Sequence, residues 1–391
     1  MPQFTFSFAC DDIEEDQNEE DQEMVDEQEV IEHGEPNVDL VPARVLELQE
    51  MLSTLPSSLA YSTHTIKTPA TTVSIPRRTL FDIRAQIMAE DDLEPDQSPS
   101  TIGLSADDIL PKTYEGGFKT WECSVELAEY LLRLMEEKKL SLEGKDVSII
   151  EASCGTSLPT SLLLSHILSL PIQPHQNHAP DPPKTTIILA DYNSQVLTHA
   201  SLPNLLLTYA SRYPDLQPFP AEETLSTLPS LLTAFTTALS ARNIHVTGLS
   251  GAWSSSFVQL ANSITCYPST TDESSPRAGA IPRHPHLKII TASETLYSPS
   301  SLPAFISTLR ELLQPPPSDP HPHPSSEFHT TLALLATKKI YFGVGGGIDQ
   351  FLERWRDDCG GWARVVWDSD RDRNADGGVG RCIVEVGIGK N

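Results

Sequence analysis

One stretch, VSIIEASCGTSLP at residues 147–159, constrains the fold more than any other part of the chain. A short apolar run ends in Glu151 and passes through a turn with Ser153 and Gly155 into an apolar segment. This pattern predicts a buried strand, a tight turn and a helix whose N-terminus can approach a ligand. We interpret it as a cofactor-binding turn, with Ser153 and Ser157 where such turns favour glycine. On these residues alone, an ordinary strand-to-helix turn explains the stretch equally well.

Strand-like and helix-like segments alternate after this turn. Expected strands are 147–152, 186–191, 244–250, 287–292, 331–337, 362–368 and 380–388, and expected helices are 157–170, 193–211, 221–241, 254–263, 300–313 and 347–358. Such alternation, closed by two consecutive strands, predicts an α/β fold. We expect a Rossmann-like, mostly parallel sheet of seven strands, with an antiparallel strand near its end and helices on both faces.

The chain divides by composition into two regions. Residues 1–112 are rich in acidic residues, Ser, Thr and Pro, and residues 11–32 hold thirteen acids and no Lys or Arg. We expect this region to be largely disordered apart from amphipathic patches at 44–55 and 79–89. Residues 113–391 should form the folded domain. Its Pro- and His-rich stretches at 171–185, 265–286 and 314–326 are expected to be inserted loops.

Bulk properties exclude several classes of protein. The net charge of −27 disfavours a broad nucleic-acid-binding surface. No apolar run approaches the roughly 20 residues that span a bilayer, and the first residues lack the basic start of a signal peptide. The six cysteines form no CxxC pair, which favours a reducing intracellular compartment. Histidines in the Pro-rich loops have no convergent Cys or acidic residues, so no metal is expected.

Polar residues follow successive strands at the edge where parallel sheets bind ligands. Asp191 follows the second strand, where it could accept hydrogen bonds from a ribose or cap the next helix. Trp253 follows the third, where it could stack on a planar base or pack in the core. After the fourth strand a loop carries Ser293, Glu294 and Tyr297.

A glycine-rich segment, YFGVGGG, follows the fifth strand. It places two aromatic residues before closely spaced glycines, which permit close backbone approach to a peptide or a cofactor. A flexible surface loop is the alternative. The residues concerned are Tyr341, Phe342, Gly343, Gly345, Gly346 and Gly347.

These residues resemble a known family, the class I S-adenosylmethionine-dependent methyltransferases. Within it the chain is similar to the protein-histidine N-methyltransferases that modify the large-subunit ribosomal protein L-three. The strings that carry the resemblance are YEGGFKTWECS, DYNSQVL, LPNLL, SGAWSSSF, SETLYS and YFGVGGGIDQF, which lie in order from Tyr114 to about Leu352.

The resemblance implies S-adenosylmethionine as cofactor and assigns residues to its site. Those expected to bind the cofactor are Thr120, Trp121, Glu122, Cys123, Ser124, Glu151, Ser153, Gly155, Asp191, Tyr192, Asn193, Gly251, Ala252, Trp253 and Ser293. The aromatic and glycine segment at 341–347 would shape the substrate side. Expected catalytic residues are Glu294, Glu122 and Tyr297, with either glutamate orienting the target imidazole.

The resemblance also sets expectations for partners and place in the cell. The substrate would be a protein, the large-subunit ribosomal protein L-three, with no direct contact to nucleic acid or membrane. We expect a monomer in the cytoplasm and nucleus. Two alternatives stay open: a lysine methyltransferase, because Glu294-x-x-Tyr297 is similar to the acid-x-x-Tyr motif of related lysine enzymes, and a non-catalytic module that escorts a ribosomal protein.

Overall fold

The computed structural model describes residues 40–93, 116–172, 182–213, 219, 222–265, 285–314, 329–342, 345–372 and 379–389. All of them belong to one unit, Leu40–Asn391. The acidic run at 11–32 lies outside the described residues, as does most of each expected inserted loop. Within the described part of the chain, no helix is both long and apolar enough to cross a bilayer.

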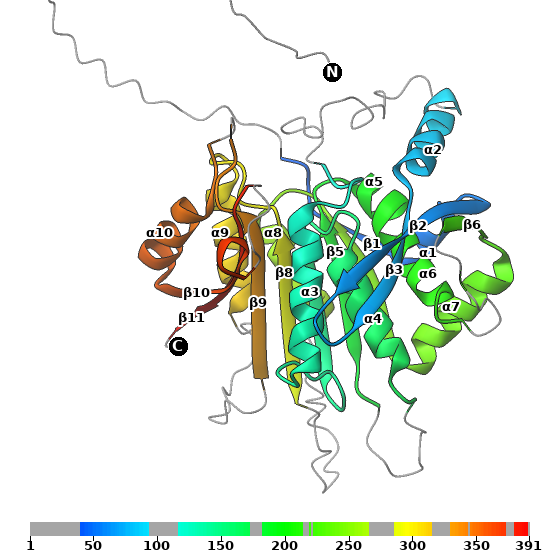
Figure 1. Cartoon of the computed structure of the whole chain (residues 1–391). Helices are drawn as coiled ribbons and strands as arrows, with labels where there is room; N and C mark the ends of the chain where they lie inside the picture. Colours follow the sequence, from blue (N-terminus) through cyan, green and yellow to red (C-terminus); the bar gives the residue numbers. More distant parts are fainter. Residues whose placement is uncertain are drawn as a thin grey trace, which may run out of the picture. The chain divides into compact units, whose positions relative to one another are not determined.

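The centre of this unit is an eight-stranded sheet (Figure 1). In spatial order its strands are β1 (Arg44–Glu47), β7 (Ile244–Ser250), β5 (Thr185–Asp191), β4 (Asp146–Ala152), β8 (His286–Ser293), β9 (His329–Lys338), β11 (Arg381–Ile388) and β10 (Gly361–Asp368). The pairs from β7 to β9 are parallel, whereas β11 runs antiparallel to both of its neighbours. All seven predicted strands are present, and the predicted fold class is confirmed. The eighth strand, β1, pairs antiparallel with β7 and was not predicted.

Parallel strands covered on both faces need apolar residues on both faces, which explains their nearly continuous apolar runs. Neighbouring residues of one strand therefore enter different cores. Ile149 and Ile187 belong to the core on one face of the sheet, and Ile150 and Ile188 belong to the core on the other.

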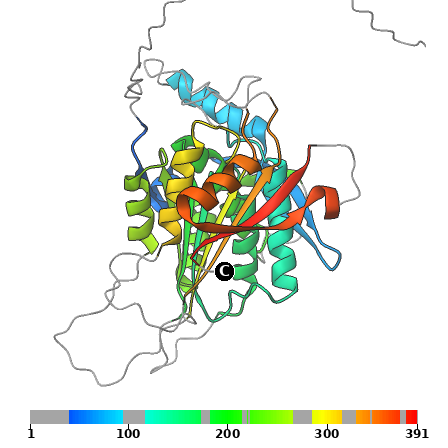
Figure 2. The ribbon, with the colours of Figure 1, turned by 90° about the vertical axis from the view of Figure 1, so that its left-hand side faces the viewer.

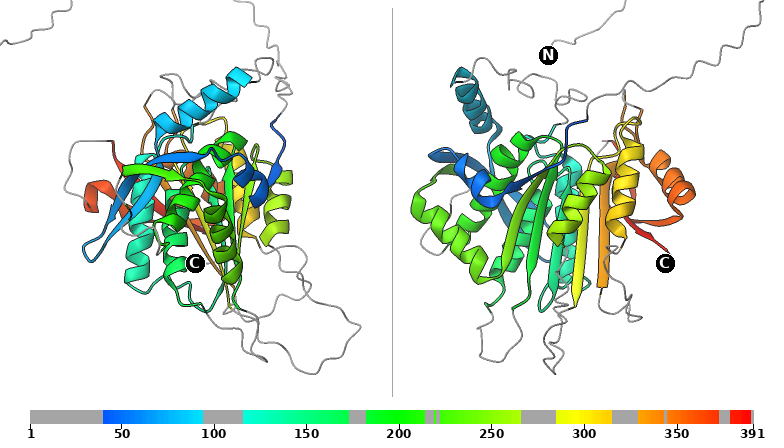
Figure 3. Two further views of the ribbon diagram at one scale, coloured as in Figure 1. Left: turned by 90° about the vertical axis from the view of Figure 1, so that its right-hand side faces the viewer. Right: turned by 180° about the vertical axis from the view of Figure 1, so that it is seen from behind.

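Helices complete the two cores. The first face is covered by α3 (Glu122–Glu136), α4 (Leu158–Ser169), α6 (Leu202–Ala210) and α7 (Pro229–Ala241). The second is covered by α8 (Ser255–Thr265), α9 (Leu302–Leu313) and α10 (Ile348–Cys359). Figure 3 shows α8 and α9 lying over the sheet when it is viewed from behind, and Figure 2 shows α10 beside β10 and β11. A short helix α5 (Ser194–Val196) and a π-helical turn at Leu197–Ser201 precede α6, and α11 (Ser369–Asp372) follows β10.

The expectation that residues 1–112 are largely disordered apart from the patches at 44–55 and 79–89 is wrong for the residues between these patches. After β1 the chain forms α1 (Leu48–Ser53), β2 (Ser58–Lys67), β3 (Thr72–Arg78) and α2 (Leu80–Leu93). The second and third strands form a three-stranded antiparallel sheet with β6 (Glu222–Ser226). Leu59, Ile66 and Ile75 of this small sheet are buried in the first core, so the segment is part of the domain.

The helix expected at 221–241 is also wrong at its start. Residues 222–226 form β6 because they pair with Ser58–Ser62 of β2, and the helix α7 begins only at Pro229. Proline is well tolerated in the first turn of a helix, so Pro229 marks the true boundary.

Candidate functional site

The predicted site residues converge at the carboxyl ends of the parallel strands. The register pairs Ala152 of β4 with Ala190 of β5 and with Ala292 of β8, so the polar residues that follow these strands begin at the same level. Asp191 is paired with Ser250 in the same way. The N-terminus of α3 lies beside them, because the amide N–H of Cys123 donates to Glu294 Oε1 over 3.3 Å.

The turn after β4 has the backbone that glycine favours. Ser153 and Ser157 both have φ of 52°, and Gly155 has φ of 50°. A left-handed conformation costs an L-residue roughly 1–2 kcal/mol, so the two serines stand at strained positions. A Cβ on Gly155 would lie 3.3 Å from both the Cα and the carbonyl oxygen of Gly117, which has φ of 116°. The GG pair before α3 therefore packs directly on the turn.

Two buried carboxylates hold this turn through backbone N–H groups. Glu151 is 1% exposed, and its Oε2 accepts the N–H of Thr160, 2.9 Å away, in the first turn of α4. Burial, assisted by the negative charge of Asp191, raises the pKa of Glu151 to about 8. Asp191 accepts N–H groups from Gly155 (3.0 Å) and Asn193 (3.3 Å). Asp191 therefore anchors both the turn and the start of α5, which leaves the ribose contact as a prediction.

Gly251, Ala252 and Trp253, which were predicted to bind the cofactor, lie against a segment that the sequence did not implicate. The N–H of Ala252 donates to the carbonyl of Val41 over 3.0 Å, and a Cβ on Gly251 would lie 2.7 Å from Ala43 Cα. Trp253 is partly buried and meets Phe257 and Phe305 edge-on, with ring centroids 5.1 and 5.6 Å apart. This packing agrees with the core alternative for Trp253.

The loop after β8 and the N-terminus of α3 form a charged cluster. Glu294 has φ of 54°, and its N–H donates to the carbonyl of Ala336 over 2.8 Å. Its side chain is 4% exposed and its Oε2 lies 3.3 Å from Lys338 Nζ. Glu122 has a side chain that is 63% exposed, and its Oε2 also lies 3.3 Å from Lys338 Nζ. Of the two glutamates predicted to be catalytic, Glu122 is therefore the accessible one.

Sequence reasoning missed Lys338 and Arg381, which neutralise this cluster. Arg381 Nε donates to Glu126 Oε1 over 2.7 Å, and Arg381 Nη1 lies 3.9 Å from Glu122 Oε2. The only signal for Lys338 was its place at the end of a predicted strand beside an aromatic pair. Cys123 and Ser124, both assigned to the cofactor, are buried, and burial raises the pKa of the Cys123 thiol well above its usual value.

Backbone hydrogen bonds join the described ends of the glycine-rich segment beside this cluster. The N–H of Tyr341 donates to the carbonyl of Gly346 (3.1 Å), and the N–H of Gly345 donates to the carbonyl of Tyr341 (3.2 Å). Tyr341 is buried against Tyr297 at a centroid distance of 6.3 Å, whereas Phe342 is 76% exposed. Tyr297 and Tyr341 therefore lie side by side, while Gly343 lies outside the described residues.

The small sheet reaches the turn through a chain of polar contacts. Arg77 Nη1 donates to Thr120 Oγ1 over 2.7 Å, and Thr120 Oγ1 is 2.9 Å from Thr156 Oγ1. The Nδ2 group of Asn204 donates to the carbonyl of Thr156 over 2.8 Å, and Asn204 Oδ1 accepts the N–H of Arg78 over 2.7 Å. Arg77 was not predicted, because the contact joins segments that are 43 residues apart.

Arg77→Met should weaken cofactor binding by about fivefold, the equivalent of one hydrogen bond of about 1 kcal/mol. The reason is that Thr120 and Thr156 lose the cation that fixes them. Calorimetric titration with S-adenosylhomocysteine, the demethylated form of the expected cofactor, measures the change. Lys67→Met removes an exposed cation from the same sheet and should bind as the unaltered protein does. Equal affinity in the two variants would contradict the proposed role of Arg77.

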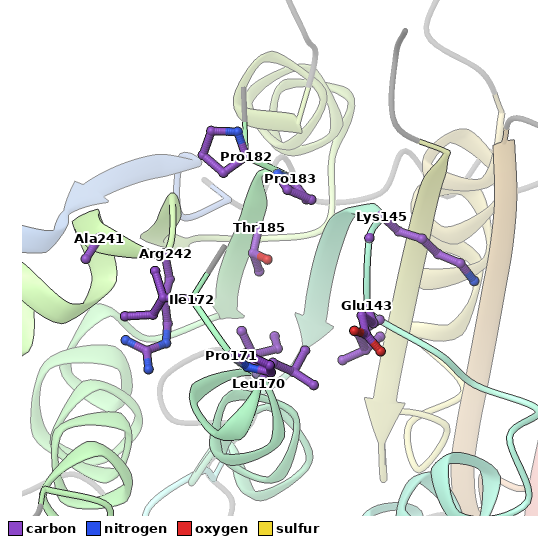
Figure 4. A pocket seen from close by; sticks show the side chains of 13 residues that line it. Glu143, Lys145, Leu170, Pro171, Ile172, Pro182, Pro183, Thr185, Ala241 and Arg242 are labelled. Atoms are coloured by element: carbon purple, nitrogen blue, oxygen red, sulfur yellow. The ribbon is translucent and has the colours of Figure 1, made fainter. Parts of the chain in front are cut away.

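A shallow hollow lies at the opposite edge of the sheet (Figure 4). Its lining includes Lys145 and Thr185, at the amino ends of β4 and β5, together with Arg242 and Ile172. It is therefore separate from the residues at the carboxyl ends. No group of three or more His, Cys, Asp or Glu among the described residues could hold a metal ion.

The carboxyl edge fits a cofactor that carries positive charge. Oε1 of Glu151 is buried and has no hydrogen-bond partner among the described residues. The Asp191 and Glu294 carboxylates lie at the ends of β5 and β8, the two strands that flank β4. An acceptor with spare capacity at this edge suits an ammonium group or hydroxyl groups of a ligand.

Comparison with known proteins gives the family. No family model matches the chain. It is 30% identical over 300 residues to Histidine protein methyltransferase 1 of Saccharomyces cerevisiae, which covers 72% of this chain and 68% of the yeast protein. The protein of the same name from Schizosaccharomyces pombe is 29% identical over 321 residues, 81% of this chain and 78% of that protein.

Solved structures are more distant. An S-adenosylmethionine-dependent methyltransferase from Clostridium acetobutylicum aligns over 68% of this chain and 92% of its own at 6% identity, with a TM-score of 0.30. A structural similarity at this level supports no conclusion about family or function. The match to the Saccharomyces cerevisiae protein is by itself enough to show the family, and it confirms the predicted family. The chain belongs to the family of histidine protein methyltransferase 1.

Proposed function

We propose that this protein transfers a methyl group from S-adenosylmethionine to a ring nitrogen of a histidine in a protein substrate. The observation that carries the proposal is the match to histidine protein methyltransferases over 72% of the chain. The second support is the group of acidic, aromatic and glycine residues at the edge of the sheet where α/β proteins bind ligands.

Methyl transfer requires little from the protein beyond alignment of the methyl donor with the acceptor nitrogen. When bound, S-adenosylmethionine supplies a methyl group activated by its sulfonium charge. The ordinary pKa of imidazole is near 6.5, so most histidines at neutral pH already carry a free lone pair and need no strong base. The protein must hold the acceptor in line and exclude water. In this proposal the turn at Ser153–Gly155 and Asp191 hold the cofactor, and the segment at 341–347 presents the substrate.

Glu122 is the better placed of the two glutamates to orient the imidazole. Its carboxylate is exposed at the mouth of the charged cluster, whereas Glu294 is buried and accepts the N–H of Cys123. A carboxylate that accepts the single N–H of the neutral ring fixes the tautomer and thereby leaves the other nitrogen to react.

At saturating cofactor, Glu122→Gln should lower the methylation rate by about tenfold or more and blur the choice of ring nitrogen. Single-turnover assays with mass spectrometry of the two methylhistidine isomers measure both effects. Glu294→Gln should act mainly on stability, because it weakens the contact between β8 and α3. If rate and nitrogen choice survive both substitutions, neither glutamate orients the imidazole.

The large-subunit ribosomal protein L-three is the substrate that we propose. The resemblance of the sequence motifs supports it, and a net charge of −27 suits a basic partner. The protein would then act as a monomer in the cytoplasm and the nucleus, where ribosomal proteins are made and assembled. Mass spectrometry of ribosomal proteins from cells with and without this protein tests the proposal. We expect one methyl group on one histidine to disappear, and its persistence would exclude this substrate.

A further inference from the structure

Lys338, the last residue of β9, lies in a site made of two carboxylates and two aromatic rings. Its Nζ is 3.3 Å from Glu294 Oε2 and 3.3 Å from Glu122 Oε2. The same atom lies 5.4 Å from the centre of the Trp121 ring and 6.0 Å from the centre of the Tyr341 ring. We call these four residues the ammonium site. The Lys338 side chain is 21% exposed, so the site lies close to solvent.

The amino group of Lys338 stays protonated and positively charged. Burial by itself would lower the pKa of its amino group, but the carboxylates of Glu294 and Glu122 outweigh burial, and the pKa is raised. The group is therefore an ammonium ion at physiological pH, and it offsets negative charge that would otherwise be concentrated at this edge.

Carboxylates and aromatic faces around one point are the usual surroundings of a bound ammonium ion. Without Lys338, the ammonium site would be suited to the side chain of a substrate lysine. With Lys338 in place, an incoming lysine meets a like charge. A neutral imidazole meets no such repulsion. Selectivity between two substrates can arise from an interaction that rejects one of them.

We propose that Lys338 determines the amino-acid specificity of the reaction: its ammonium group fills the ammonium site and thereby excludes lysine in favour of histidine. The inference rests on the proposed function, because it takes this edge as the place where the acceptor side chain is presented. It also explains how the chain can carry the Glu294-x-x-Tyr297 pattern, similar to that of lysine enzymes, within a family of histidine methyltransferases.

The two possible reactions differ in where a proton goes. With histidine, the ring nitrogen forms the new N–C bond as the S–C bond breaks, and the resulting imidazolium releases its other N–H proton to water. With lysine, the ammonium group must first lose a proton to water or to a carboxylate such as Glu122, and only then can its lone pair form the N–C bond. In both, the sulfonium leaves as a neutral thioether.

The test compares the products of Lys338→Met with those of the unaltered protein. Each is incubated with a ribosomal-protein fraction and methyl-labelled S-adenosylmethionine, and the hydrolysates are analysed for labelled methylhistidine and methyllysine. We expect the ratio of methyllysine to methylhistidine to rise about tenfold or more in Lys338→Met, since a like charge in a partly screened site costs at least one factor of ten. Lys338→Arg keeps the positive charge and should keep the original ratio.

Lys339→Met is the matched control, because the neighbouring Lys339 pairs instead with Asp368 (2.8 Å) and Asp370 (2.7 Å). It should leave the ratio unchanged. No rise in Lys338→Met, or an equal rise in Lys338→Arg, would overturn the inference. If Lys338→Met does not fold, Lys338→Gln is titrated with Nα-acetyl-lysine amide, and unchanged affinity overturns the inference as well. Formation of methylhistidine by the unaltered protein tests the proposed function, whereas the ratio in Lys338→Met tests the role of Lys338. Failure of one is therefore distinguishable from failure of the other.

Discussion

Glu151→Gln should make the stability of this protein much less dependent on pH between about 4.5 and 8. The pKa of the Glu151 carboxyl is raised from 4.5 to about 8 in the folded protein because the group is buried beside Asp191. Between these values the folded state keeps the proton and the unfolded state releases it. The free energy of unfolding therefore falls as pH rises through this window, by about 1.4 kcal/mol per pH unit from this group. It levels off above pH 8.

Glutamine is the appropriate replacement because its carbonyl can still accept the N–H of Thr160. The variant stays neutral at every pH, so it should overtake the unaltered protein in stability as pH rises and remain above it beyond pH 8. Denaturant unfolding of the two proteins across pH 4.5 to 9 gives the difference in unfolding free energy directly. Glu143→Gln, at an exposed position before β4, should unfold like the unaltered protein throughout. A difference between Glu151→Gln and the unaltered protein that does not change with pH would show that Glu151 is ionised in the fold.

The parallel sheet was predictable because each of its strands is recognisable from its own sequence. Strands buried on both faces, such as Asp146–Ala152 and Thr185–Asp191, require continuous apolar runs, and these stand out against the polar loops. Their carboxyl ends meet at one edge whatever the details of packing, which is why the residues after each strand could be assigned to one site.

The small sheet and β1 were not predictable in the same way. Ser58–Lys67 and Glu222–Ser226 are mixed in polarity, and the pairing between them joins segments that are far apart in the sequence. The same limit applies to side chains. Lys338 and Arg77 matter through contacts with Glu294 and Thr120, and no local pattern reveals such contacts.

The predicted site residues lie at the sheet edge, but the hydrogen bonds that they make were not predictable. Asp191 and Glu151 were expected to face a ligand, and they hold backbone N–H groups of the turn. Buried carboxyl oxygens usually accept hydrogen bonds, and the nearest donors to both side chains are backbone N–H groups at the starts of helices and in the turn after β4. The geometry of the turn thus depends on the same carboxylates that the sequence marked as ligand-binding.

Gly346→Ala should abolish methylation of the protein substrate, by about a hundredfold or more, while cofactor binding persists. A Cβ at this buried position would overlap the carbonyl group of Tyr297 and lie 2.5 Å from the carbonyl oxygen of Leu296. Backbone atoms cannot yield as a flexible side chain would, so the turn at 341–346 must move. It would carry Tyr341 with it, away from Thr337 Oγ1, which is 3.2 Å from the Tyr341 hydroxyl. A displacement of about 1 Å in groups that position a reactant can cost a hundredfold in rate.

Gly345→Ala is the matched control, because it replaces a glycine without creating a steric clash with the backbone. Gly345 has φ of 84°, so alanine is strained there by about 1–2 kcal/mol, but its Cβ would meet nothing nearer than Pro299 Cγ at 3.9 Å. We therefore expect a modest loss of stability and a rate within about tenfold of the original. Single-turnover rates at saturating cofactor, together with calorimetric titration of S-adenosylhomocysteine, compare the two variants. Equal rates would mean that the close approach of Gly346 to Tyr297 has no part in presenting the substrate, because Gly345→Ala introduces no such contact.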